Sequence, residues 1–228
     1  MLVSGGAGFL GSHLVDALID RGDEVLVLDD LSRGDLSQVN SKAKFVEGDV
    51  RIYEDWNKAV TDLKPDIIHH LAAVNGTRRF HEEADMVVDV NINGTRMALQ
   101  CAKENGAKIV FYSSPEAFGE QETMPLSNES MSLFTPPYLH QRHSYGGSKL
   151  IGELLCHFEH RKGLDVVIVR PCNAYGPRLR GDANGQVVSM MMKANPIIVH
   201  GDGTQTRSLT WVGAVSYTHL RAHETRSY

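Results

Sequence analysis

Cysteine is scarce in this sequence, with three among 228 residues. Cys101, Cys156 and Cys172 are widely spaced and odd in number, which indicates reduced thiols of a cytoplasmic protein without a metal or redox motif. No apolar run approaches the length of a membrane span, and no secretory leader precedes the first apolar segment. The 23 Lys and Arg are outnumbered by 28 Asp and Glu and form no basic stripe, which argues against a nucleic-acid partner. The sequence thus predicts no metal, membrane or nucleic-acid association.

Short apolar runs rich in β-branched residues alternate with stretches of helical spacing through most of the chain. Such near-continuous apolar runs between helices indicate a parallel sheet covered on both faces. The predicted fold class is therefore α/β with a doubly wound parallel sheet, and ligands are expected beyond the carboxyl ends of its strands. The predicted strands are 1–3, 24–28, 44–47, 66–71, 108–113 and 165–170, and the predicted helices are 12–20, 55–63, 85–105 and 144–162. An irregular, proline-bearing segment is expected at 120–142.

Three glycines follow the first predicted strand at G-x-x-G-x-x-G spacing: Gly5, Gly8 and Gly11. Residues without a Cβ let backbone N–H groups approach a pyrophosphate, and the following helix N-terminus adds partial positive charge. A glycine triplet alone is common in turns. This one has the strand–turn–helix context that dinucleotide binding requires.

Asp29 ends the second predicted strand, about twenty residues after the glycines. A carboxylate there accepts hydrogen bonds from the adenosine ribose and repels a 2′-phosphate, which favours NAD over NADP. Two alternatives stay open: Asp29 could merely begin a polar turn, and Arg33 could meet a 2′-phosphate.

Tyr145 and Lys149 are four residues apart, which places them on one face of the predicted helix 144–162. A lysine beside a nicotinamide cation and a phenol stabilises the phenolate, so Tyr145 is predicted to act as a base near neutral pH. The preceding predicted strand ends in Ser113 and Ser114, two hydroxyls at the edge where the cofactor is expected.

With these motifs the sequence resembles the extended short-chain dehydrogenase/reductases, specifically the NAD-dependent nucleotide-sugar epimerase/dehydratase family, over about residues 1–213. The matching motifs include the segment 91–95 (N-I-N-G-T), typical of a family helix. The resemblance implies an enzyme that is a homodimer when full length, with NAD as cofactor and a nucleotide diphosphate sugar as substrate. The implied cofactor-binding residues are Gly5, Gly8, Phe9, Leu10, Gly11, Asp29, Asp49, Val50, Leu71, Ala72, Ala73, Tyr145 and Lys149. The implied substrate-binding residues are Ser114, Asn173, Arg178 and Arg207, with the arginines facing the diphosphate.

The resemblance implies transient oxidation at sugar C4, with Tyr145 as base, Lys149 as its stabiliser and Ser114 orienting the hydroxyl. Epimerisation, 4,6-dehydration or decarboxylation could follow. Dehydratases of the family use an adjacent Asp-Glu pair where this chain has Pro115 and Glu116, so Glu116 is the fourth candidate catalytic residue. Two alternatives are a non-catalytic NAD(P)-binding regulator and a reductase of a carbonyl compound that is not a sugar.

Three segments are predicted from these patterns. Residues 1–180 form a NAD-binding Rossmann domain, and 181–213 begin a substrate-binding domain that the chain does not complete. The apolar pattern breaks after about Gly213, and 214–228 are similar to a translated sequencing adapter, so we expect a non-native tail there on a C-terminally truncated fragment.

Overall fold

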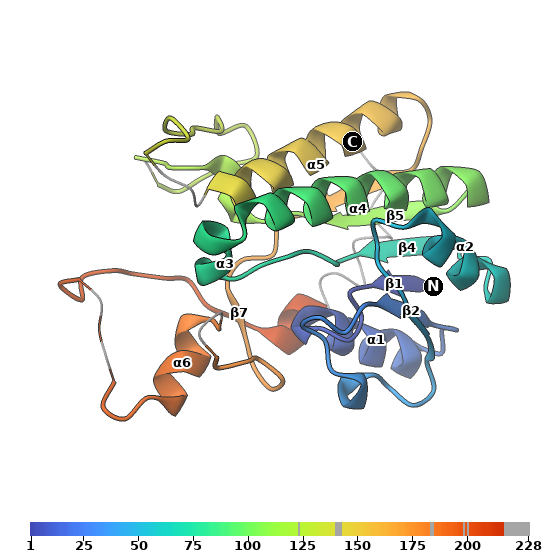
Figure 1. The fold of residues 1–228 in the computed structure, drawn as a ribbon, viewed down its shortest axis with the longest axis horizontal. Coiled ribbons are helices and arrows are strands. Elements are labelled where there is room, and N and C mark those ends of the chain that lie inside the picture. Colours follow the sequence, from blue (N-terminus) through green and yellow to red (C-terminus); the bar gives the residue numbers. More distant parts are fainter. Residues whose placement is uncertain (123, 140–142, 183–184, 198, 200, 217–228) are drawn as a thin grey trace.

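Six strands form a single parallel sheet in the computed structural model, which describes residues 1–122, 124–139, 143–182, 185–197, 199 and 201–216 (Figure 1). The strand order is β3-β2-β1-β4-β5-β6, so the order reverses between β1 and β4. This reversal opens a crevice at the carboxyl ends of the central strands, where doubly wound folds bind ligands. The predicted fold class is confirmed. The strands are β1 (Leu2–Ser4), β2 (Leu26–Asp29), β3 (Lys44–Glu47), β4 (Ile67–His70), β5 (Lys108–Tyr112) and β6 (Val166–Val169).

Helices connect these strands, and a smaller unit of two short strands follows them. The helices are α1 (Phe9–Arg21), α2 (Tyr53–Asp62), α3 (Thr77–Glu82), α4 (Ala84–Asn105), α5 (His143–Arg161) and α6 (Val187–Lys193). Two 3₁₀ turns are η1 (Leu36–Gln38) and η2 (Pro115–Phe118), and the short strands are β7 (Ala174–Tyr175) and β8 (Thr210–Trp211).

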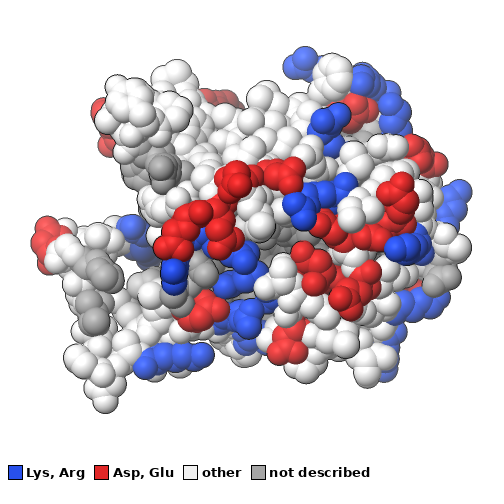
Figure 2. Space-filling view, in the orientation of Figure 1, with Lys and Arg blue, Asp and Glu red and all other residues white. Residues whose placement is uncertain are grey.

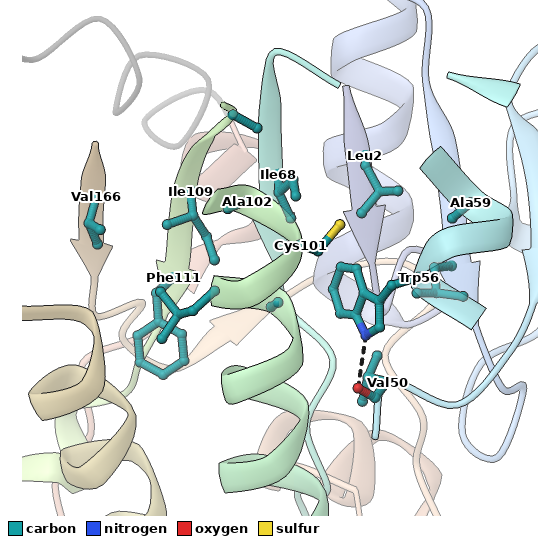
Figure 3. Packing of buried hydrophobic residues seen from close by; sticks show 14 of the residues in the cluster. Leu2, Val50, Trp56, Ala59, Ile68, Cys101, Ala102, Ile109, Phe111 and Val166 are labelled. Carbon is teal, nitrogen blue, oxygen red and sulfur yellow. Dashed lines mark hydrogen bonds between the residues drawn. The ribbon is translucent and has the colours of Figure 1, made fainter. Parts of the chain in front are cut away.

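The two faces of the sheet are covered by different helices. Successive strand residues point to opposite faces, so Leu2 packs with Trp56 and Ala102 under α2 and α4, as Figure 3 shows. Val3 instead packs against Leu14 of α1 on the other face. Burial of both faces explains why the strands have nearly continuous apolar sequences.

Three helix boundaries follow from glycines. α1 begins at Phe9, not at the predicted residue 12, because Gly8 caps it in extended geometry and the next glycine, Gly11, already lies inside the first turn. α1 and α4 end at Gly22 and Gly106, whose φ values of 98° and 65° are left-handed. Helix α3 was not predicted.

In the described part of the segment predicted to be irregular, 120–142, Leu133 forms an isolated bridge with Gly119, which directly precedes the segment. Residues 123 and 140–142 lie outside the described residues. Of the predicted tail, 214–216 continue a helical stretch that begins at 212, and 217–228 lie outside the described residues. The division into two domains and a tail stays a prediction. Of the helices in the described part, none combines the length and apolarity that crossing a bilayer requires. Figure 2 shows Lys and Arg interspersed with Asp and Glu over the visible face.

Candidate active site

The glycine turn after β1 is too crowded for side chains. A Cβ on Gly5, whose φ is 76°, would lie 2.6 Å from the backbone nitrogen of Ala72. A Cβ on Gly11 would lie 2.1 Å from the carbonyl oxygen of Gly5. The turn therefore exposes backbone at the start of α1, where the first N–H groups of a helix have no intrahelical acceptor. This cradle fits a dinucleotide pyrophosphate.

Asp29 fastens the neighbouring loop to this turn. Its carboxylate oxygens accept hydrogen bonds from the backbone N–H groups of Ala7 at 3.0 Å and Leu31 at 2.9 Å. Burial raises the pKa of Asp29, and the two backbone bonds oppose this shift. Asp29 is thus more than the start of a polar turn: it sets the shape of the pocket edge. Its contact with a ribose stays a prediction.

Arg33, weighed above as a contact for a 2′-phosphate, is engaged elsewhere. Its guanidinium pairs with Asp182 at 3.2 Å, and its carbonyl accepts a hydrogen bond from Arg180 Nη1 at 3.0 Å. The pairing neutralises Arg33 and is consistent with a preference for NAD.

The segment after β4 lies directly against the glycine turn. The backbone N–H groups of Leu71 and Ala72 both donate to the carbonyl of Ser4 at 3.0 Å. Ala73 continues this half-buried segment. Three of the predicted cofactor residues thus line the switch point of the sheet.

Asp49 and Val50 follow β3 and are fixed by the side chains of Arg51 in the same loop and Trp56 of α2. Arg51 pairs with Asp49 at 2.5 Å, and this pairing holds the pKa of Asp49 below its usual value. The indole of Trp56 donates to the carbonyl of Val50 at 2.8 Å (Figure 3). Both residues are half-buried or buried beside the sheet edge, and their contact with adenine stays a prediction.

Tyr145, Lys149 and Ser114 meet where β5 ends. Lys149 Nζ donates to the carbonyl of Tyr112 at 2.7 Å and lies 5.8 Å from the centroid of the Tyr145 ring. The Ser114 side chain caps η2 by accepting from the Glu116 N–H at 3.2 Å, and it is close enough to Tyr145 to lower the pKa of the phenol. The four predicted catalytic residues therefore come together from η2, its N-cap and α5.

Burial dominates the electrostatics of this group. It raises the pKa of Tyr145 to about 12, with Ser114 lowering it and Glu116 raising it. Burial also lowers the pKa of Lys149 to about 8, while Cys156 and Glu153 oppose the shift. Burial of the phenol thus opposes the predicted role of Tyr145 as a base near neutral pH, and that role stays a prediction.

The predicted substrate residues are scattered. Arg178 pairs with Asp16 of α1 at 2.7 Å, and Asn173 is exposed, with its carbonyl accepting from the Thr210 N–H at 2.9 Å. Arg207 is exposed and donates to the neighbouring Thr206 carbonyl at 2.7 Å. Among the contacts of the described residues, neither arginine meets the Tyr145 group, so their role toward a diphosphate stays a prediction.

Two contacts that position Tyr145 and its helix were not predicted from the sequence. Phe80 of α3 stacks on Tyr145 with ring centroids 5.0 Å apart. Asn91 of α4 accepts from the Val74 N–H at 2.8 Å and donates to Ser148 at 3.0 Å. The segment 91–95 was singled out as a motif, but its contacts with α5 could not be read from spacing, and nothing in the sequence marks Phe80.

The fold and the site define a dinucleotide-dependent enzyme of the dehydrogenase/reductase type. Residues 1–227 match the model of the NAD dependent epimerase/dehydratase family, and the chain belongs to this family. The predicted family membership, enzyme class and NAD cofactor are thereby confirmed, and the alternatives of a regulator or a reductase of other carbonyl compounds are not favoured.

Similar proteins share most of the chain. It is 34% identical over 92% of its length to a UDP-N-acetyl-alpha-D-glucosaminuronate decarboxylase of Bacillus cytotoxicus and spans 67% of that protein. It is 30% identical over 97% of its length to a UDP-glucose 4-epimerase of Mycolicibacterium smegmatis, of which it spans 72%. Among solved structures, UDP-glucose 4-epimerase with UDP-glucose from Thermotoga maritima is similar with a TM-score of 0.89 and 30% identity, covering 98% of this chain and 72% of that one.

Proposed function

We propose that the chain converts a nucleotide diphosphate sugar of the UDP-sugar class by transient oxidation at sugar C4. The observation that carries the proposal is the meeting of Tyr145, Lys149 and Ser114 at the strand ends of a family fold whose glycine turn admits a dinucleotide. The similarity to UDP-sugar epimerases and a decarboxylase supports the substrate class.

The chain's own groups divide the work of the first step. NAD⁺, when bound, supplies the acceptor for the C4 hydrogen with its electron pair and a positive charge near Tyr145. Tyr145, as phenolate, takes the proton of the sugar 4-hydroxyl, which leaves a 4-keto sugar. Ser114 lowers the pKa of Tyr145 against the effect of burial. We infer that the Lys149 ammonium, 5.8 Å from the centroid of the Tyr145 ring, also favours the phenolate. Ser114 also orients the 4-hydroxyl toward Tyr145.

Glu116 bears on the second step. It lies in η2 and raises the pKa of Tyr145, which places its charge near the reacting group. Pro115 precedes it and has no titratable group, so an adjacent acid–base pair is missing from η2. We therefore favour epimerisation or decarboxylation over 4,6-dehydration.

Incubation with NAD and UDP-glucose, UDP-galactose or UDP-glucuronate tests the proposal, with products resolved by chromatography and mass spectrometry. The expected product is either the C4 epimer at unchanged mass or a decarboxylated pentose from the glucuronate. Reduction of a non-sugar ketone with NADPH, without conversion of any UDP-sugar, would overturn it.

The homodimer predicted from the family resemblance has a candidate interface on α4 and α5, which lie side by side (Figure 1). Ile151, Leu154 and Phe158 form one exposed apolar row on α5, and Leu154 is 60% exposed. Met86 and Val88 are exposed on α4. Pairing two copies through these helices would bury apolar surface that water otherwise contacts. Sedimentation should give twice the chain mass for the wild type and the single-chain mass for Leu154→Glu; a monomeric wild type would refute the dimer.

We also propose a cytoplasmic location, which cysteine usage supports: Cys101, Cys156 and Cys172 form no disulfide among the described residues.

A further inference from the structure

Glu153 and Arg170 form an ion pair directly behind the strand end that carries Ser114. Arg170 Nε and Nη2 donate to the two Glu153 oxygens at 2.7 and 2.6 Å, in a two-bond fork. The Glu153 side chain is only 6% exposed. Burying an ion pair gains little stability over apolar packing. The two-bond geometry of this ion pair, and its contacts with β5 and η2, indicate a role other than stabilising the fold.

Glu153 holds the end of β5. Ser113 Oγ donates to Glu153 Oε1, while one turn earlier Lys149 donates to the carbonyl of Tyr112. Two consecutive turns of α5 therefore bind two consecutive residues of the chain just before Ser114. Ser114, the N-cap of η2, follows directly, so these bonds set its position.

Arg170 holds the other end of η2. Its guanidinium carbon lies 4.2 Å from the ring centroid of Phe118, the last residue of η2. Between the two ends, a Cβ on Gly146 would lie 2.4 Å from the carbonyl oxygen of Glu116, so α5 approaches η2 as closely as a glycine permits.

We propose that Glu153 and Arg170 are positioning residues of the active site, which together fix the loop carrying Ser114 and Glu116 against Tyr145. Neither touches the reacting atoms: Glu153 acts through Ser113, and Arg170 acts through Phe118. The kinetic consequence of this proposal rests on the proposed function.

Glu153 also influences Lys149, one helical turn away. Burial lowers the pKa of Lys149, whereas Cys156 and the Glu153 charge raise it. His70 is neutral at working pH, because burial and Lys149 lower its pKa to about 3, and burial raises the pKa of Cys156. Among the described groups that face Lys149, Glu153 is thus the anion that keeps the ammonium charged. These titratable groups are Tyr145, Glu153 and Cys156 of α5 and His70 of β4; the Tyr112 carbonyl and the Phe111 ring of β5 complete the surroundings.

Glu153→Gln keeps the size of the side chain but loses its charge, and its single amide oxygen cannot accept from both Ser113 and the two Arg170 donors. We expect kcat to fall about 10- to 100-fold with KM changed less than about twofold, since a misplacement on the order of 1 Å has this effect. Without the Glu153 charge the pKa of Lys149 falls, so the loss of activity on the alkaline side, set by Lys149, should move to lower pH.

The matched control is Glu159→Gln on the same helix, where Glu159 pairs with Lys162 at 2.8 Å. It should leave kcat and the pH profile as in the wild type. A Glu153→Gln enzyme with wild-type kcat and pH profile would overturn the proposal.

Hydrogen–deuterium exchange of the peptide 113–119 gives a readout that needs no turnover. Exchange there should be faster in Glu153→Gln and in Arg170→Lys, which loses the fork and the stacking, than in Glu159→Gln. Unchanged exchange in both variants would overturn the positioning role even if UDP-sugars are converted. Faster exchange in a protein that converts no UDP-sugar would instead support the positioning role and refute the proposed function.

Discussion

Phe80 stacks on Tyr145, with ring centroids 5.0 Å apart and ring planes 19° from parallel. Both rings are buried, with Val74 and Val87 completing a small cluster apart from the main core. The short helix that carries Phe80 is bound to α5 by a hydrogen bond from Ser144 to the Phe80 carbonyl at 3.3 Å. The stack fixes the plane in which the phenol hydroxyl faces Ser114.

Phe80→Leu keeps an apolar side chain and removes the stack. We expect a loss of about 1 kcal/mol in the free energy of unfolding, the usual worth of an aromatic pair. We also expect a fall in kcat that exceeds any change in KM, because Tyr145 loses its orientation. Urea unfolding and steady-state kinetics measure the two effects. Phe45→Leu in β3 is the control, and an equal fall in kcat in both variants would show that the stack has no special role.

Tyr145→Phe removes the hydroxyl and leaves the ring. Turnover should fall by roughly 10²- to 10⁴-fold, the usual contribution of a positioned acid or base. The affinity for NAD should change little, because the phenol is expected to contact substrate. Isothermal titration and single-turnover assays separate these quantities. An unchanged rate would remove Tyr145 from the mechanism.

Gly11→Ala places a methyl carbon 2.1 Å from the carbonyl oxygen of Gly5, a backbone atom that cannot move alone. We expect a stability loss of about 1–3 kcal/mol, typical of overpacking, together with weaker NAD binding. Gly147→Ala is a suitable comparison, because a Cβ on this helical glycine meets nothing within 4 Å. That variant should gain roughly 0.5–1 kcal/mol. Normal NAD affinity in Gly11→Ala would refute the tight-turn argument.

Much of this architecture was predictable because buried strands and tight glycine turns are marked by short, local sequence patterns. The apolar runs located all six strands of the sheet, and the glycine spacing located the cofactor turn. The stack of Phe80 on Tyr145 was not predictable, since α3 is too short for a periodic signal and its position depends on tertiary contacts. The sequence holds only a weak sign of the pairing between Glu153 and Arg170. Glu153 is a charged residue two turns after Tyr145, on the buried face of the same helix.

The pKa values of Tyr145 and Lys149 also could not be predicted from sequence patterns. The four-residue spacing predicts that Lys149 and Tyr145 are neighbours, which the structure bears out. Whether the ammonium or desolvation controls the phenol depends on how completely both are buried, and sequence spacing carries no such information.

Asp29→Asn tests the basis of the NAD preference. The amide keeps one acceptor for the bonds from Ala7 and Leu31 and removes the charge that would repel a 2′-phosphate. We expect the ratio of NAD to NADP affinity to fall about tenfold, the size of one screened charge–charge repulsion near a protein surface. Titration of both cofactors measures the ratio. A ratio equal to that of the wild type would mean that the carboxylate acts only on the loop.

The fate of a deuterium placed at C4 of the accepted UDP-sugar tests the central claim most directly. Transient oxidation removes this hydrogen from the sugar and returns it within the same catalytic cycle, so mass spectrometry should find the label retained in the product sugar. Loss of the label to solvent, or its recovery in released cofactor beside an oxidised sugar, would contradict the account.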